Sequence, residues 1–198
     1  MTDRTRRIVI PLAAFLFGLV ALGIAAVMTL TPQGREVAAS SVGGPFALVN
    51  HHGEPVSEQD FLGEPHLVFF GFTHCPDVCP TKLWEMSEIL AYVSETRGRD
   101  IRALFITVDP ERDTPEILQN YLSSFDDRIV GLTGTPEAVA DAVRTFRAFA
   151  RRVPLEDGDY TMEHTAIVYI MDAQGRFVAG LDTTRAPSDA AAELLRRI

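Results

Sequence analysis

The residues of this chain whose type and spacing most directly indicate chemistry are Cys75 and Cys79, its only two cysteines. Three residues separate them, and each is followed by a proline. Thiolates bind soft metal ions, exchange disulfides or join each other in a disulfide. The usual redox spacing is one residue shorter, and two cysteines alone cannot complete a four-ligand zinc site. The pair therefore indicates a soft-metal site with a further donor, a redox-active dithiol or an inert disulfide.

A histidine is the third donor that suits a copper site with two thiolates, and the chain has five. His164 directly precedes an expected strand, residues 165–170, and approaches the thiols if that strand lies beside the cysteine-bearing one. A lone histidine at such a position is often structural. The side chain of His74 diverges from that of its neighbour Cys75. The remaining histidines are expected in a turn or at the far end of a strand: His51, His52 and His66.

The cysteines lie where an apolar strand gives way to a helix. Residues 66–72 form a continuous apolar run, which is typical of a strand buried on both faces of a sheet. Apolar residues at helical spacing follow over 81–97, with Gly98 just beyond the end. Ligands bind at the carboxyl edge of such sheets, and a helix N-terminus favours a thiolate. We therefore expect an accessible pair of thiols with lowered pKa values.

The rest of the chain alternates further strands and helices. Strands are expected at 46–49, 102–108, 129–132, 165–170 and 177–179, and helices at 114–125, 138–150 and 188–198. Two of these helices follow a Thr-Pro-Glu start, in which a capping hydroxyl precedes proline. A turn at 172–175 predicts an antiparallel hairpin. This order predicts an α/β domain with a mixed central sheet and helices on both faces.

An apolar segment without charges, residues 8–30, precedes the folded domain. A membrane-spanning helix needs roughly 20 such residues, and the basic residues within 1–7 keep the N-terminus cytoplasmic. We expect an uncleaved single-pass anchor, with a cleaved signal peptide as the alternative. Residues 31–43 predict a flexible tether. Residues 44–198 then form a domain on the periplasmic or other extracytoplasmic side of the membrane.

The overall charge excludes one class of partner. The formal net charge is -9 at pH 7, and 46% of the residues are hydrophobic, which is typical of a folded domain. Binding to nucleic acid depends on a cationic face. We therefore expect no nucleic-acid partner.

Three sequence motifs resemble those of the Sco/SenC family of copper proteins. They are FGFTHCPDVCP, which contains both cysteines, then FITVDPERDTPE, and then GLTGTPE, followed by Tyr160 and His164. The resemblance covers about residues 44–182, which is most of the folded domain. It implies a thioredoxin-like fold with extra elements at the N-terminus and before the histidine-bearing strand.

The same resemblance implies a copper site. Its ligands would be Cys75, Cys79 and His164, all of which are present in this sequence. Asp77 and Asp109 match positions that the family keeps near the site, although turn and cap chemistry explains them equally well.

The resemblance implies a copper metallochaperone that binds Cu(I) and Cu(II) and helps assemble the copper A centre of cytochrome c oxidase. Its expected partner is the copper-bearing subunit of that oxidase or another copper-handling protein, and copper transfer requires no catalytic turnover. The alternative is a membrane-tethered thiol–disulfide reductase, in which Cys75 and Cys79 are the redox-active pair and His164 has little use. A peroxidase would need Thr73 and Arg112 around an activated thiol, and it would leave His164 unexplained.

Overall fold

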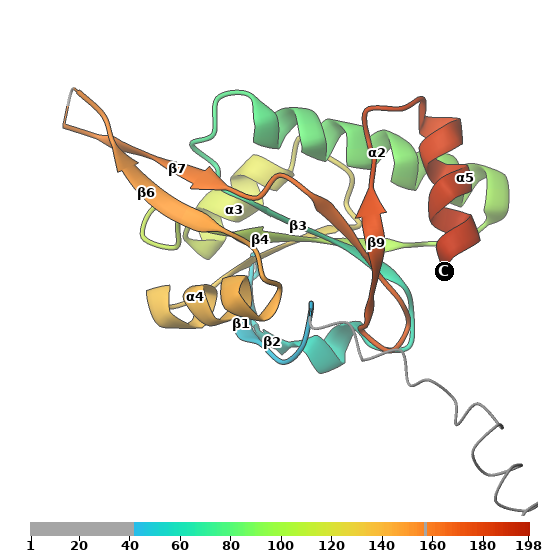
Figure 1. Ribbon diagram of the computed structural model, residues 1–198, viewed down its shortest axis with the longest axis horizontal. Coiled ribbons are helices and arrows are strands. Elements are labelled where there is room, and N and C mark those ends of the chain that lie inside the picture. The colour runs from blue at the N-terminus through green and yellow to red at the C-terminus, as the bar shows by residue number, and fades with distance from the viewer. Residues whose placement is uncertain (1–41, 157) are drawn as a thin grey trace, which may run out of the picture. The chain divides into compact units, whose positions relative to one another are not determined.

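A seven-stranded mixed sheet forms the centre of the domain in the computed structural model, which describes residues 42–156 and 158–198. The order of its strands is β2-β1-β5-β4-β3-β8-β9 (Figure 1). These strands are β1 (Ala47–Asn50), β2 (Pro55–Ser57), β3 (His66–Gly71), β4 (Arg102–Thr107), β5 (Ile129–Thr133), β8 (Val168–Met171) and β9 (Phe177–Leu181). A separate two-stranded sheet pairs β6 (Ala150–Pro154) with β7 (Tyr160–His164).

The centre of the sheet is parallel and its flanks are antiparallel. Strands β3, β4 and β5 run parallel to one another, whereas β8 pairs antiparallel with β3 and β1 pairs antiparallel with β5. Every residue of β3 is buried, because this strand lies in the middle of a sheet covered on both faces. The strand predicted at 66–72 is thus confirmed, and its carboxyl end leads into the cysteine loop.

Helices cover both faces of this sheet (Figure 1). Helices α2 (Val78–Arg97) and α5 (Pro187–Arg197) pack together on one face, and α4 (Pro136–Thr145) lies on the other, beside β1. Helix α3 (Pro115–Leu122) packs on β5, and the loop after it reaches α2, where the Asp126 N–H donates to Ser87 Oγ at 3.1 Å. A short 3-10 helix, η1 (Glu58–Phe61), follows β2. The predicted thioredoxin-like α/β fold is confirmed.

The two Thr-Pro-Glu segments begin helices as predicted. The hydroxyl of Thr114 accepts the N–H of Ile117 at 3.3 Å, and that of Thr135 accepts the N–H of Ala138 at 3.2 Å. In both cases proline occupies the first turn, where its missing N–H costs no hydrogen bond.

Several helix boundaries differ from those expected, and α3 ends at Leu122 instead of residue 125. Helix α2 begins at Val78 instead of residue 81, so Cys79 lies inside its first turn. Helix α4 ends at Thr145 instead of residue 150, and Arg147 follows with φ at 50°. A left-handed residue ends a helix, but glycine is its usual signal. Because the left-handed residue here is an arginine, the sequence gives no signal for the end of α4.

The hairpin β6–β7 was not expected as a pair of strands. Most of its side chains are exposed or only partly buried, so the alternating apolar pattern of a half-buried strand is missing. It projects from the main sheet in Figure 1. The strand predicted at 165–170 begins only at Val168, and His164 instead ends β7.

The predicted N-terminal segment (1–7) and anchor (8–30), with nearly all of the predicted tether (31–43), lie outside the described residues. Within the part of the chain that the structure does describe, no helix is both long enough and apolar enough to cross a bilayer. This part of the predicted domain organisation stays a prediction.

Candidate metal centre

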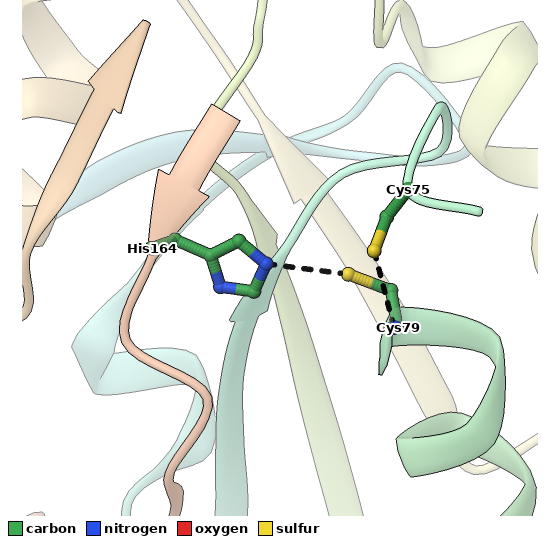
Figure 2. Close-up of side chains that lie close together, drawn as sticks. All are labelled: Cys75, Cys79 and His164. Atoms are coloured by element: carbon green, nitrogen blue, oxygen red, sulfur yellow. Dashed lines mark hydrogen bonds between the residues drawn. The ribbon is translucent and has the colours of Figure 1, made fainter. Parts of the chain in front are cut away.

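Cys75, Cys79 and His164 come together at the carboxyl edge of β3 (Figure 2). Cys75 lies in the loop after β3, Cys79 in the first turn of α2, and His164 at the last position of β7. The three donor atoms all lie within 4.8 Å of one another. The Sγ atom of Cys79 lies 3.5 Å from Nε2 of His164. Among the described residues, no other cluster of three or more cysteine, histidine or acidic side chains has this metal-site geometry.

The two thiols, both free, have different surroundings. Cys79 is fully buried, whereas Cys75 is partly exposed. The backbone N–H of Cys79 donates to Sγ of Cys75 at 3.4 Å, so the helix N-terminus does face a sulfur atom. Burial raises the pKa of the Cys79 thiol, because an apolar environment disfavours the thiolate. The expectation of two accessible thiols with lowered pKa values is therefore wrong for Cys79.

Gly71, the last residue of β3, makes room for the buried thiol. A Cβ atom at this position would lie 2.9 Å from Sγ of Cys79 and 2.5 Å from Cε2 of Phe105. Both distances are shorter than van der Waals contact. The absence of a side chain thus allows α2 to bring Cys79 directly against the end of the central strand.

Hydrogen bonding and packing orient the imidazole of His164. Its Nδ1 lies 3.1 Å from the carbonyl oxygen of Thr165, so an N–H there would donate to that oxygen and leave Nε2 unprotonated toward Cys79. The rings of Phe69 and Phe72 meet the imidazole edge to face, at centroid distances of 6.2 and 5.7 Å. Burial lowers the pKa of His164, which keeps the ring neutral and able to bind a metal.

The two aspartates predicted near the site have different environments. Asp77 is exposed at the N-cap position of α2, and its side chain makes no capping hydrogen bond. Asp109 is 2% exposed and accepts hydrogen bonds from Arg112 Nε at 2.5 Å and Tyr160 Oη at 3.0 Å. Asp109 therefore contacts the start of the strand that carries His164. Arg112, which a peroxidase would need beside its thiol, is paired with Asp109 instead.

Asp113 is a residue near the site that sequence reasoning missed. Its buried carboxylate accepts a hydrogen bond from Thr107 Oγ1 at 2.5 Å. It also accepts the Thr73 hydroxyl at 2.6 Å and the Thr73 backbone N–H at 3.1 Å. Burial raises the pKa of Asp113, and these hydrogen bonds oppose that change. The available signal was its place in the motif VDPERDTP. Asp113 matters to the site because its partner Thr73 lies two residues before Cys75.

Tyr121 of α3 was also missed. Its ring lies 6.0 Å from that of Phe105, and its buried hydroxyl has no hydrogen-bond partner among the described residues. Burial raises the pKa of Tyr121, and the nearby Cys79 and Cys75 add to this effect. In the sequence, Tyr121 is explained by helical packing alone, so no motif distinguishes it.

The other four histidines are not part of the cluster. His74 is exposed, and His66 begins β3 at the opposite end from the cysteines, as predicted. His51 and His52 lie in the turn after β1. His51 is partly buried, and its Nδ1 accepts the N–H of Gly131 at 2.9 Å.

Comparison with known families agrees with this geometry. The SCO1/SenC family model matches residues 34–198. The chain belongs to the SCO1/SenC family. Its cysteine motif, its histidine-bearing hairpin and the central sheet all lie within the matched range.

Individual SCO1/SenC relatives extend the comparison. The copper-bound structure of ScoI from Bradyrhizobium japonicum is 49% identical, covers 79% of this chain and 99% of its own, and has a TM-score of 0.74. The copper-bound ScoI of Arabidopsis thaliana is 33% identical over 79% of this chain and 97% of its own, with a TM-score of 0.75. The human mitochondrial SCO1 homologue is 43% identical over 146 residues, which are 73% of this chain and 48% of that protein. The chain spans about half the length of the curated relatives first matched.

The donor set of this SCO1/SenC chain fits copper. Two thiolates and one imidazole are soft and intermediate donors, and Cu(I) accepts low coordination numbers. A structural zinc site would need a fourth ligand, and calcium or magnesium would need oxygen atoms. The three donor atoms, within 4.8 Å of one another, suit a single copper ion.

Proposed function

We propose that this protein binds Cu(I) and Cu(II) through Cys75, Cys79 and His164 and delivers the ion to another protein. The observation that carries this proposal is the convergence of two thiols and one imidazole Nε2 within 4.8 Å, from three different elements. The copper-bound ScoI structures of its relatives support the choice of ion. Copper is cargo in this proposal, so the chain needs ligands and an exit for the ion but no catalytic group.

The three ligands serve the two oxidation states differently. The thiolates of Cys75 and Cys79 suit the soft Cu(I) ion, and the imidazole of His164 makes the site acceptable to Cu(II). The imidazole is held by the hydrogen bond between its Nδ1 and the Thr165 carbonyl oxygen and by the rings of Phe69 and Phe72. In this orientation its Nε2 faces Cys79. Cys75 is the more exposed thiol, so an incoming cysteine or histidine of a partner can reach the ion from its side.

The acceptor that the family resemblance implies is the copper-bearing subunit of cytochrome c oxidase, at its copper A centre. A membrane location fits this role, because the acceptor is itself a membrane enzyme. We propose that residues 8–30 anchor the chain and that the domain faces the extracytoplasmic side. An acidic protein with a net charge of -9 would bind most readily to a basic surface of its partner.

The competing function is thiol–disulfide reduction on a partner protein. The contact between the Cys79 N–H and Cys75 Sγ favours it, because a helix N-terminus stabilises a thiolate. The Cys75 thiolate would attack a partner disulfide, and Cys79 would then displace the partner's thiol from the mixed disulfide. The products are a reduced partner dithiol and a Cys75–Cys79 disulfide. This reaction uses both cysteines but not His164.

A copper titration with matched variants separates these functions. The reduced, metal-free protein is titrated with Cu(II), and Cu(I) affinity is measured by competition with a chelator. We expect His164→Ala to weaken Cu(II) binding by at least about tenfold, or ~1.4 kcal/mol, and Cu(I) binding much less. Cys75→Ser or Cys79→Ser should abolish tight Cu(I) binding. His74→Ala is the control, because His74 is exposed and outside the cluster.

Each outcome has a definite meaning. Unchanged Cu(I) affinity in either cysteine variant would remove the copper assignment. Equal losses of Cu(I) and Cu(II) affinity in His164→Ala would contradict the role given to the imidazole. If copper binds weakly to the wild-type protein and the dithiol reduces partner disulfides with or without His164, the reductase function replaces the proposed one.

A further inference from the structure

Residues 107–114, which comprise the last residue of β4 and the segment that leads to α3, contact both of the chain segments that carry the candidate ligands. We call this segment the clasp. The loop between β3 and α2, residues 72–77, contacts it through Thr73, and the hairpin β6–β7 contacts it through Tyr160. The clasp belongs to neither, and its side chains are not among the three donor atoms.

On the hairpin side, Arg112 is the main contact. Its Nε donates to Asp109 at 2.5 Å, and its Nη1 donates to the backbone carbonyl of Tyr160 at 3.1 Å. Its guanidinium carbon also lies 3.8 Å from the centre of the Tyr160 ring. The Tyr160 hydroxyl closes the contact by donating to Asp109 at 3.0 Å. Tyr160 is the first residue of β7, and His164 is the last.

A second arginine encloses the same tyrosine. The guanidinium carbon of Arg152 in β6 lies 3.9 Å from the centre of the Tyr160 ring. Two guanidinium groups this close to one ring must occupy opposite faces, so the ring of Tyr160 is held between Arg112 and Arg152. Arg152 is also paired with Glu111 of the clasp. Cation–π contacts of this kind contribute most when they are shielded from water.

On the cysteine side, Asp113 is the main contact. Its carboxylate accepts the hydroxyl of Thr73 at 2.6 Å and the N–H of Thr73 at 3.1 Å. Thr73 is the second residue after β3 and lies two positions before Cys75. Asp113 is fully buried, so these hydrogen bonds are shielded from solvent and hard to replace.

The clasp has hydrogen bonds of its own. The N–H of Asp113 donates to the carbonyl of Asp109 at 2.9 Å, and the N–H of Asp109 donates to Thr107 Oγ1, also at 2.9 Å. The Thr107 hydroxyl in turn donates to Asp113. The two anchoring aspartates are therefore fixed relative to each other.

The hairpin needs such a contact. A two-stranded sheet in which no side chain is fully buried is marginally stable by itself. From the conjunction of these contacts we propose that the clasp sets the distance between His164 and the two thiols, with Arg112 as the positioning residue for His164. The proposal rests on the proposed function in so far as the three donors bind copper. Arg112 acts through the hairpin and does not touch the ion.

The first test measures the metal-free protein. Amide hydrogen exchange of β7 is compared in wild type, Arg112→Met and Arg128→Met. Arg128 is the matched control, because its Nη2 makes a partly buried ion pair with Asp126 at 2.5 Å, away from the hairpin. We expect faster exchange in β7 for Arg112→Met alone. Unchanged exchange in that variant would overturn the proposal whether or not the protein binds copper.

The second test measures copper affinity. Arg112→Met should weaken Cu(II) binding by about tenfold and should change Cu(I) binding by less than about twofold. In a protein that already carries His164→Ala, adding Arg112→Met should cause no further loss of Cu(II) affinity. Tyr160→Phe, which keeps the ring and loses only the hydroxyl, should show the same pattern with a smaller effect. It also replaces Arg112→Met if that variant does not fold. Equal losses for Cu(I) and Cu(II), or the same Cu(II) loss in the His164→Ala background, would overturn the proposal.

The cysteine side has its own variant. Thr73→Val removes the hydroxyl that donates to Asp113 and keeps the shape of the side chain. It should weaken Cu(I) binding severalfold while β7 exchange stays at the wild-type rate. Wild-type Cu(I) affinity in Thr73→Val would overturn the role of Asp113 in placing the thiols. Absence of copper binding in the wild-type protein would overturn the proposed function, and the exchange measurement would still decide the role of Arg112.

Discussion

Cys79 has its position because a neighbouring side chain is absent. Its sulfur occupies space beside Phe105 that any Cβ at position 71 would enter. The buried thiol is thereby packed like a core residue, with no exposed surface. Packing of this density tolerates little added volume. At the scale of single residues, the site is therefore constrained by sterics as well as by ligand chemistry.

We expect Gly71→Ala to lower the free energy of unfolding by about 1–3 kcal/mol, because the added methyl group overpacks the core. It should also weaken Cu(I) binding, because the sulfur of Cys79 must move. Gly180→Ala in β9 is the control, since its Cβ would meet only the exposed side chain of Ile167, at 3.2 Å. Denaturant unfolding and chelator competition measure the two effects. Equal behaviour of the two variants would argue against this steric account.

Two helices of the domain, α3 and α4, begin where a threonine side chain caps the first turn. Thr114 and Thr135 each satisfy a backbone N–H that the first helical turn leaves without a partner. Only Thr114 belongs to the clasp, whereas Thr135 precedes α4. Loss of the two caps should therefore have similar effects on stability but different relevance to the site.

We expect Thr135→Ala to lower the free energy of unfolding by about 1 kcal/mol, because the N–H of Ala138 loses its acceptor. Thr135→Ser keeps a hydroxyl and should recover most of this loss. Copper affinity should stay at the wild-type value in both variants. Denaturant unfolding gives the stability difference, and Thr135→Ala and Thr135→Ser proteins of equal stability would show that the cap contributes nothing.

For the whole molecule, stability depends on pH through its buried histidines. Burial lowers the pKa of His66, His164 and His51 from the ordinary value of 6.5. The unfolded chain therefore binds protons at a higher pH than the folded protein does. Stability is fully present above about pH 7.5 and is lost as pH falls through 6.5 toward the lowered folded-state values. Asp113, whose pKa burial raises, acts in the opposite sense in acid.

We expect the free energy of unfolding of the metal-free protein to fall between pH 7.5 and 5.5. The largest contribution should come from His66, which is the most buried of the three, because solvent screens the more exposed His51 and His164. His66→Gln should reduce the slope, whatever it does to stability at pH 7.5. Denaturant unfolding at several pH values gives the slopes. A slope in His66→Gln equal to that of wild type would remove His66 from this explanation.

How far the sequence predicted the structure depended on which residues face the core. The strand 66–71 and the Thr-Pro-Glu helix starts were predictable, because burial and capping restrict residue type strongly. The hairpin that carries His164 was not, because it stands outside the core and its side chains have no need to be apolar. The end of α4 was missed for a local reason, since Arg147 has a positive φ without being glycine.

The candidate site was predictable to a different extent. Composition and spacing indicated the thiols, but the choice of His164 over other histidines came from the family resemblance. The burial of Cys79 was not foreseen, because helix-dipole reasoning does not include the desolvation of a core position. The roles of Arg112 and Asp113 require contacts between segments distant in sequence, which no local pattern encodes.

The two halves of the site are attached to the protein in different ways, and this bears on its reduction potential. Cys79 belongs to the core, whereas His164 ends a hairpin that lies outside the main sheet (Figure 1). A partner that draws the hairpin aside would remove the imidazole and leave the thiolates in place. Because the imidazole favours Cu(II), the same movement would raise the potential of the ion and favour the reduced form. The position of the hairpin and the reduction potential of a bound copper ion would then be thermodynamically coupled, and the electron itself would come from a separate donor.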